Sequence, residues 1–275
     1  MTCKVIKYLM ENEIYTAGID IGSLSAQAVI LRGSEVVSYS NIIAGANRAE
    51  TSNKVVDMAL ETTDLSREDL KYIVGTGYGR YQVPFANKNV TEITCHARGI
   101  HFYFPNVRTL LDMGGQDCKA ISCGERGQVM SFVMNEKCAA GTGRSIEVIS
   151  KLLDIPLEEI GPRSLNIQET PPVLSNTCVV FAKSEALQLI RKGIAVNNVL
   201  AAYCDALARK VLSLINRIGM KQEFAISGGI AKNMGVVKRI EDYLGVKANI
   251  CDEPQIVGAV GAALIAQNNY LKMNK

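Results

Sequence analysis

The sequence contains two similar segments, and this repeat constrains the fold more than any other feature. The first, GIDIGSLSAQAVIL, begins at Gly18, and the second, LLDMGGQDCKAISC, begins at Leu110. Five residue pairs are separated by the same 92 positions: Asp20 and Asp112, Gly22 and Gly114, Ser23 and Gly115, Gln27 and Lys119, and Ala28 and Ala120. One constant offset over five positions indicates a duplicated structural unit.

Each copy predicts a strand, a tight glycine turn and a second strand. The expected order is three strands, a helix, a strand and a helix, occurring twice, with additional helices in the second half. The expected strands are residues 14–21, 26–32, 35–43, 72–74, 107–113, 118–122, 129–134, 223–227 and 246–250; the expected helices are 53–62, 143–153, 179–192, 197–218, 234–244 and one from 257. We therefore expect an α/β protein with one domain at 1–108 plus about 253–275 and another at 109–252, facing each other across a ligand cleft.

The composition excludes several classes of protein. Thirty basic and 27 acidic residues give no charge field that would favour nucleic acid. The sequence has no window as apolar as a membrane helix and no signal-like start, so no membrane association and a cytoplasmic location are expected. In that compartment the eight cysteines would be reduced thiols, metal ligands or core residues rather than a disulfide framework.

Both repeated turns have features of a phosphate site. An aspartate ends an apolar strand, and the glycines after it let backbone amides approach an anion without a Cβ in the way. The carboxylates of Asp20 and Asp112 are suited to hold Mg²⁺ through its water shell. A third signal, FAISGGIAKN at 224–233, is a buried strand followed by a glycine pair and a helix start, where a nucleoside can lie against bare backbone.

Two cysteines precede predicted helices. Cys138 stands before AAGTGRSIEVI and Cys178 before VVFAKSEALQLI. A helix N-terminus carries unpaired N–H groups and partial positive charge, which lower a thiol pKa and favour an anionic iron–sulfur cluster. A cubane cluster needs four thiolates, so two chains would have to share one. From local context alone, both cysteines also fit simple packing roles.

The three turns resemble the phosphate-1, phosphate-2 and adenosine motifs of the ATPase superfamily of actin, Hsp70 chaperones and sugar kinases (ASKHA). The resemblance implies metal-side carboxylates at Asp20 and Asp112, with Asp112 or Gln116 orienting the attacking water. It also implies ATP or ADP with Mg²⁺, held by phosphate-binding and nucleoside-binding residues, namely Gly22, Ser23, Gly114, Gly115, Gly228 and Gly229.

Further motifs narrow this resemblance. The segments NEKCAAGTGR, TGYGR, EITCHARG, DMGGQD and SNTCVVFAKSE together look like those of the activators of 2-hydroxyacyl-CoA dehydratases, of the BadF/BadG/BcrA/BcrD type. The resemblance implies a homodimer sharing one [4Fe–4S] cluster through Cys138 and Cys178 of each subunit. It also implies ATP-driven electron delivery to an iron–sulfur dehydratase or reductase component, with ferredoxin or flavodoxin as donor. Gly141 and Gly143 would let the backbone near Cys138 reach the nucleotide.

Three positions depart from the pattern of this family. Leu24 stands where a small hydroxyl residue is usual, Gln27 where a lysine is usual, and Lys183 where a glutamate is usual. Two other functions stay open: an ATP-binding subunit of a benzoyl-CoA-type reductase, and a metal-free small-molecule kinase or regulatory nucleotide sensor.

Other notable residues carry less specific expectations. The histidines His96 and His101 and the cysteines Cys118 and Cys123 are expected to be structural. Arg80 either reaches the cleft or only caps a turn. The glycine- and alanine-rich run QIVGAVGAALIAQ predicts a close-packed final helix.

Overall fold

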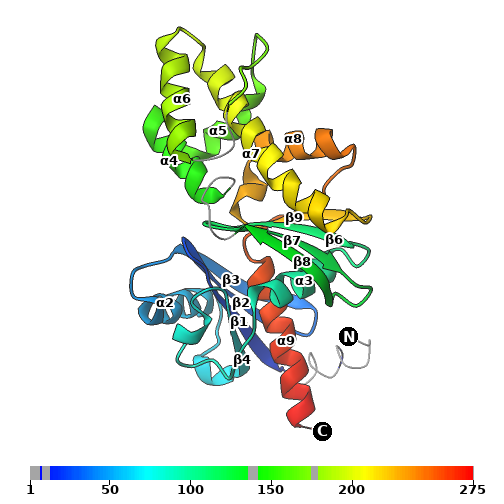
Figure 1. Cartoon of the computed structure of the whole chain (residues 1–275). Coiled ribbons are helices and arrows are strands. Elements are labelled where there is room, and N and C mark those ends of the chain that lie inside the picture. Colours follow the sequence, from blue (N-terminus) through cyan, green and yellow to red (C-terminus); the bar gives the residue numbers. More distant parts are fainter. Residues whose placement is uncertain (1–6, 8–12, 136–141, 175–178, 275) are drawn as a thin grey trace. The chain divides into compact units, whose positions relative to one another are not determined.

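The chain folds into two compact units in the computed structural model, which describes residues 7, 13–135, 142–174 and 179–274 (Figure 1). The first unit comprises the described residues of Met1–Val107, Cys123–Met130 and Gln255–Lys275. The second comprises those of Arg108–Ser122 and Ser131–Pro254. Among the helices of these described ranges, none is long and apolar enough to cross a membrane.

The first unit is built on a five-stranded mixed sheet. Its strands are β1 (Tyr15–Ile21), β2 (Ser25–Arg32), β3 (Glu35–Ile43), β4 (Leu70–Thr76) and β5 (Lys88–Asn89), in the order β3-β2-β1-β4-β5. The first three strands pair antiparallel, and β1–β4 and β4–β5 pair parallel. The carboxyl ends of the parallel strands β1 and β4 therefore meet at one edge, where a ligand site is expected.

Helices cover both faces of this sheet. Helix α2 (Arg48–Leu60) packs on one face, and helices α9 (Val257–Met273) and α3 (Glu92–Tyr103) lie on the other (Figure 1). Side chains of β2 alternate accordingly, since Ile30 belongs to the apolar cluster of α2 while Leu31 belongs to that of α9. A strand buried on both faces reads as a continuous hydrophobic run, as β2 does.

Glycine allows α9 to pack closely, as its glycine- and alanine-rich sequence predicts. A Cβ placed on Gly261 would overlap the backbone carbonyl of Cys95 in α3 and would lie 2.8 Å from the amide nitrogen of Gly99. Because these neighbours are backbone atoms, they cannot rotate away. The two helices can therefore approach this closely only with a residue that has no side chain at position 261.

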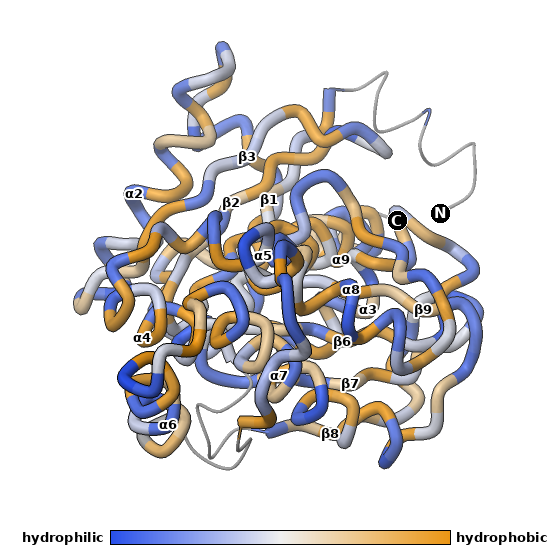
Figure 2. The backbone as a smooth tube through the Cα atoms, turned by 90° about the horizontal axis from the view of Figure 1, so that it is seen from above, coloured by the Kyte–Doolittle hydropathy of each residue, from blue (hydrophilic) through white to orange (hydrophobic). Residues whose placement is uncertain are grey.

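The second unit has a four-stranded sheet in the order β8-β7-β6-β9. Its strands are β6 (Thr109–Met113), β7 (Cys118–Cys123), β8 (Val129–Asn135) and β9 (Phe224–Ser227). Its helices are α4 (Gly143–Leu153), α5 (Leu157–Leu165), α6 (Val179–Arg191), α7 (Val196–Ile218) and α8 (Met234–Leu244). The long helix α7 supplies much of the apolar core. Surface helices such as α2 and α6 carry both hydrophilic and hydrophobic residues (Figure 2).

Most predicted elements are present. The helix that follows the fourth strand, predicted without bounds, is α3; the short strand β5 is not predicted, and three further differences concern other elements. Helix α2 begins at Arg48, five residues before the predicted start at Asn53. Helix α5, which contains Pro162, has no counterpart among the predicted elements. The strand predicted at 246–250 forms only an isolated bridge between Asn249 and Ala225.

The duplication is visible in the backbone pairing. Asp20 lies opposite Gln27 in the β1–β2 ladder, and Asp112 lies opposite Lys119 in the β6–β7 ladder. The turns also repeat, because the amide of Gly22 donates to the Ser25 carbonyl and the amide of Gly114 to the Asp117 carbonyl, both at 2.9 Å. The two copies thus share strand register and turn geometry.

Candidate functional site

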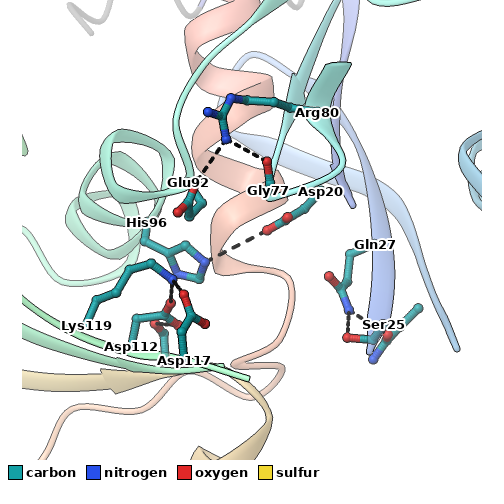
Figure 3. Close-up of polar contacts among 12 residues, drawn as sticks. Asp20, Ser25, Gln27, Gly77, Arg80, Glu92, His96, Asp112, Asp117 and Lys119 are labelled. Carbon is teal, nitrogen blue, oxygen red and sulfur yellow. Dashed lines mark hydrogen bonds and ion pairs between the residues drawn. The ribbon is translucent and has the colours of Figure 1, made fainter. Parts of the chain in front are cut away.

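The first candidate carboxylate, Asp20, is buried near the end of β1. Its Oδ2 lies 3.9 Å from Nε2 of His96, which α3 carries, and both residues are 6% exposed (Figure 3). A Cβ on Gly258, at the start of α9, would overlap Asp20 Oδ2 and lie 2.8 Å from His96 Nε2. The absence of a side chain at Gly258 therefore leaves the space that the Asp20 carboxylate and the His96 imidazole occupy.

The TGYGR segment, residues 76–80, packs against the end of β1, where the first glycine turn begins. The amide of Gly79 donates to the Ile21 carbonyl at 2.9 Å, and Gly77 adopts a φ of +83°. A Cβ on Gly77 would overlap Asp20 Oδ1. Glycine is therefore required at position 77 for two reasons, the positive φ and the close contact with Asp20. Arg80 donates from Nη1 to the Gly77 carbonyl at 2.9 Å and to Glu92 Oε2 at 3.4 Å (Figure 3). Of the two roles open to Arg80, these contacts are those of a turn cap.

The neutral residue opposite Asp20 is also engaged. Gln27 donates from Nε2 to Ser25 Oγ and to Asn41 Oδ1, both at 2.8 Å (Figure 3). The amide thereby links β2 to its own turn and to β3. It brings no charge to the first turn.

The second candidate carboxylate, Asp112, has a charged neighbour instead. Lys119 Nζ lies 3.8 Å from Asp112 Oδ2 and forms a closer ion pair with Asp117 (Figure 3). Ser227 of β9 donates from Oγ to Asp112 Oδ1 at 3.0 Å. The lysine and both carboxylates are buried, so the lysine offsets charges that would otherwise be very costly there. Asp117 is not among the site residues predicted from the sequence. Its position in the second repeat, between Gly114 and Lys119, could have indicated it.

The predicted nucleoside glycines follow β9. Gly228 has a φ of +86°, and a Cβ there would overlap the Met113 carbonyl and lie 3.0 Å from Asp112 Oδ1. Gly229 is exposed at the start of a short 3-10 helix, Gly229–Lys232. The structure thus brings the third motif next to the second turn.

The start of α4 is attached to the second turn. The amide of Gly143 donates to the Gly114 carbonyl at 3.0 Å, and that of Arg144 to the Gly115 carbonyl at 2.8 Å. Gln116 between these glycines and Asp117 is exposed. The segment that carries Cys138 therefore leads directly into a helix bonded to the predicted phosphate turn.

The predicted cluster ligands Cys138 and Cys178, and the glycine Gly141, lie outside the described residues. The described cysteines, Cys95, Cys118, Cys123, Cys204 and Cys251, are all buried and form no disulfide among themselves. Burial raises the pKa of Cys95 to about 12 and that of Cys251 to about 11, which favours the protonated thiol. Within the described ranges, no group of three or more His, Cys, Asp or Glu side chains is placed to hold a metal ion. These five thiols are packing residues, as predicted for Cys118 and Cys123.

Two strand–turn–strand units, each with a buried aspartate beside a glycine turn, define a duplicated α/β fold with two candidate phosphate turns. The chain belongs to the BadF/BadG/BcrA/BcrD ATPase family, whose model matches residues 17–266. This confirms the family resemblance predicted from the cysteine and glycine motifs.

Individual relatives agree with this assignment. The chain is 39% identical over 253 residues to the activator of lactoyl-CoA dehydratase of Anaerotignum propionicum, covering 92% of this chain and 97% of the relative. It is 30% identical over 261 residues to a benzoyl-CoA reductase subunit of Thauera aromatica, covering 90% and 92%. Its relatives thus include both a dehydratase activator and a reductase component.

Solved structures confirm the fold class. The activator of the 2-hydroxyisocaproyl-CoA dehydratase from Clostridium difficile with bound ADPNP superposes with a TM-score of 0.90 at 37% identity, covering 95% of this chain and 97% of that one. A ROK family glucokinase from Streptomyces griseus gives a TM-score of 0.57 at 13% identity, covering 92% and 99%. The second likeness concerns the fold alone, which is the predicted one of sugar kinases and their relatives.

Proposed function

We propose that this protein is an ATP-dependent electron-transfer activator of a 2-hydroxyacyl-CoA dehydratase or a similar iron–sulfur enzyme. The observation that carries the proposal is the attachment of α4 to the turn at Gly114 and Gly115, because it joins the Cys138 segment to a predicted phosphate site. The family assignment and the activators among its relatives support the same role.

The turns themselves indicate which atoms would bind phosphate. The amides of Gly22 and Gly114 already donate within their turns. A phosphate group would therefore take its hydrogen bonds from the amides that follow, beginning at Ser23 and Gly115. Mg²⁺, when bound, would neutralise phosphate charge, and the carboxylate of Asp20 would hold its water shell. Gly228 and Gly229 would lie at the nucleoside.

We assign the water-orienting role to Gln116 rather than to Asp112. Asp112 accepts from Ser227 and lies beside Lys119, so its oxygens are already engaged. Gln116 is exposed on the same turn. An amide can accept from a water and donate to a phosphate at once, which suits in-line attack without a covalent intermediate.

The proposed cluster ligands are Cys138 and Cys178 from each of two subunits. Helix α6 begins at Val179, directly after Cys178, and α4 begins a few residues after Cys138. Partial positive charge at these helix starts would favour thiolates and an anionic cluster. A bound [4Fe–4S] cluster would accept and release one electron at a time, taken from ferredoxin or flavodoxin in the cytoplasm.

Exposed apolar side chains flank both cysteines in the sequence, which supports a homodimer. Met130 and Phe132 on the edge strand β8 are 63% and 47% exposed, and Phe181 on α6 is 63% exposed. Phe and Met side chains are enriched at protein–protein interfaces relative to the rest of the surface. Lys183, exposed on the same helix, adds a positive charge that would favour an acidic surface on the electron-accepting partner.

Anaerobic purification tests the proposal. The protein should be a brown homodimer with about four irons per dimer, as one cubane cluster requires. A double variant with Cys138→Ala and Cys178→Ala should lose the iron and the absorption while keeping nucleotide binding. Cys251→Ala, a buried cysteine outside the proposed ligand set, is the matched control and should keep the iron. Full iron content in the double variant would rule the cluster assignment out.

The likeness to the Thauera aromatica reductase component favours one alternative, an ATP-binding subunit of a larger reductase. A permanent component of that kind should co-purify with unrelated chains at a fixed ratio. An activator should purify on its own as a homodimer. It should activate its partner enzyme at substoichiometric amounts.

A further inference from the structure

Arg48, the first residue of α2, reaches the turn of the first unit. Its Nη2 donates to the carbonyl of Ser23 at 3.0 Å. The helix is already capped by Asn47, whose side chain accepts from the amide of Glu50. A positive charge at a helix N-terminus opposes the helix dipole, so helix stability does not account for an arginine at this position. Its contact with the turn is the feature to explain.

The other terminal nitrogen of this guanidinium is buried without a partner. Among the described residues, none accepts a hydrogen bond from Arg48 Nη1, although that atom is inaccessible to solvent. A buried charged donor without an acceptor is destabilising, and an acceptor of negative charge at this place would remove the penalty. Arg48 therefore has donor capacity left at a turn that is predicted to bind phosphate.

The duplication shows what charge the first turn otherwise lacks. Lys119 lies opposite Asp112 in the second unit, whereas the neutral Gln27 lies opposite Asp20 in the first. The amide of Gln27 is committed to Ser25 and Asn41. Arg48 belongs to helix α2, outside the repeated strand–turn–strand segment, and it brings a positive charge to the first turn.

We infer that Arg48 is a nucleotide-phosphate ligand of the first unit. One end of its guanidinium holds the Ser23 carbonyl, and the other end donates to a phosphoryl oxygen. A planar guanidinium suits this double role, since its two terminal nitrogens carry separate N–H donors at fixed angles and can serve two different acceptors. The inference rests on the proposed function, because it takes the Gly22–Ser23 turn to be a phosphate site.

Calorimetric titration tests this on the full-length protein with Mg²⁺, using a non-hydrolysable ATP analogue and, separately, adenosine. Arg48→Gln should bind the analogue about 10- to 100-fold more weakly, as expected for a lost charge-assisted hydrogen bond. It should bind adenosine unchanged, because adenosine has no phosphate. Arg67→Gln is the matched control: Arg67 packs beside the same helix, where it binds Asn53 and Asp57. This control should bind both ligands like the wild type.

A second variant replaces the lost charge of Arg48 by a lysine at position 27, within the first repeat. Adding Gln27→Lys to Arg48→Gln should restore a large part of the affinity for the analogue. Arg48→Lys, which keeps the charge without the fork, should give an affinity between those of wild type and Arg48→Gln. It also serves if Arg48→Gln does not fold by circular dichroism.

The outcomes separate this inference from the proposed function. Failure of the wild type to bind the analogue would overturn the proposed function, and this inference with it. Normal binding by the wild type together with equal binding by the Arg48 variants would overturn only the inference. Equal losses for the analogue and adenosine would also overturn it, because they would mean that Arg48 acts on the structure rather than on phosphate.

Discussion

Lys119 lies directly opposite Asp112 in the β6–β7 ladder and is almost completely buried, with 2% of its surface exposed. It is also the ion-pair partner of Asp117. Gln27 occupies the equivalent position opposite Asp20. The two copies of the repeat therefore share a backbone and differ in charge: the second balances its carboxylates within the repeat, and the first does not.

Removal of the buried lysine should be strongly destabilising. Lys119→Met keeps most of the volume but leaves two carboxylates buried together, so the free energy of unfolding should fall by about 3–5 kcal/mol. Urea denaturation followed by circular dichroism measures this. Lys238→Met removes one partner of an exposed ion pair with Asp242 and should cost about 0.5 kcal/mol or less. Similar losses for both variants would contradict the role given to Lys119.

Two glycines of α9 should respond differently to alanine. At Gly258 the new Cβ would meet the ends of the Asp20 and His96 side chains, which can move. We expect Gly258→Ala to fold but to lose ATP hydrolysis, because the carboxylate is displaced. At Gly261 the new Cβ would meet backbone of α3, so Gly261→Ala should lower the melting temperature by several degrees. Thermal melts and phosphate release, measured on both variants, distinguish the two effects.

The thiol of Cys95 should make stability depend on alkaline pH. Burial raises its pKa from the ordinary 9.0 to about 12, so the folded chain keeps a proton that the unfolded chain loses. Its contribution is complete below pH 9 and is lost as the pH rises from about 9 to about 12. Cys95→Ala should flatten this part of the curve of unfolding free energy against pH. An unchanged slope in the variant would contradict the assignment.

Thiol labelling should separate the two groups of cysteines. At pH 8, Cys95 should present roughly a thousandfold fewer thiolates than an ordinary cysteine, given the difference between 9.0 and about 12. The proposed ligands Cys138 and Cys178 should react first with iodoacetamide in iron-free protein and be protected when the cluster is present. Peptide mass spectrometry over a time course measures both. Early labelling of Cys95 or Cys204 would show that these thiols are more accessible than their burial indicates.

Replacement of Gln116 should affect hydrolysis more than binding. If its amide orients the attacking water, Gln116→Ala should slow ATP hydrolysis roughly 100-fold or more while nucleotide affinity changes little. Single-turnover hydrolysis beside a binding titration measures the two quantities. Gln128→Ala is the control, since that amide serves a turn of the first unit by accepting from Arg126. Equal rates in the two variants would return the role to Asp112 or to no side chain.

The sequence predicted the repeat, its strand–turn–strand units and the family, because these depend on local pattern and on glycine spacing. It missed α5, whose Pro162 is unusual inside a helix, and it overextended the strand at 246–250. It predicted that Asp20 and Asp112 lie near the ends of strands, as they do in β1 and β6, and that Gly22, Gly114 and Gly115 lie on the turns that follow. Contacts between residues far apart in the sequence could not be predicted from local pattern. His96 lies beside Asp20, 76 positions away, and Arg48 contacts Ser23, 25 positions away.

The two hydrogen bonds between α4 and the second turn have a mechanical consequence. An α-helix of 11 residues is a stiff rod roughly 16 Å long, with about 1.5 Å of rise per residue. The amides of Gly143 and Arg144 fasten its first residues to the carbonyls of Gly114 and Gly115. A displacement of these two glycines would therefore pass directly to the first turn of α4, and from there along the helix toward its end at Leu153.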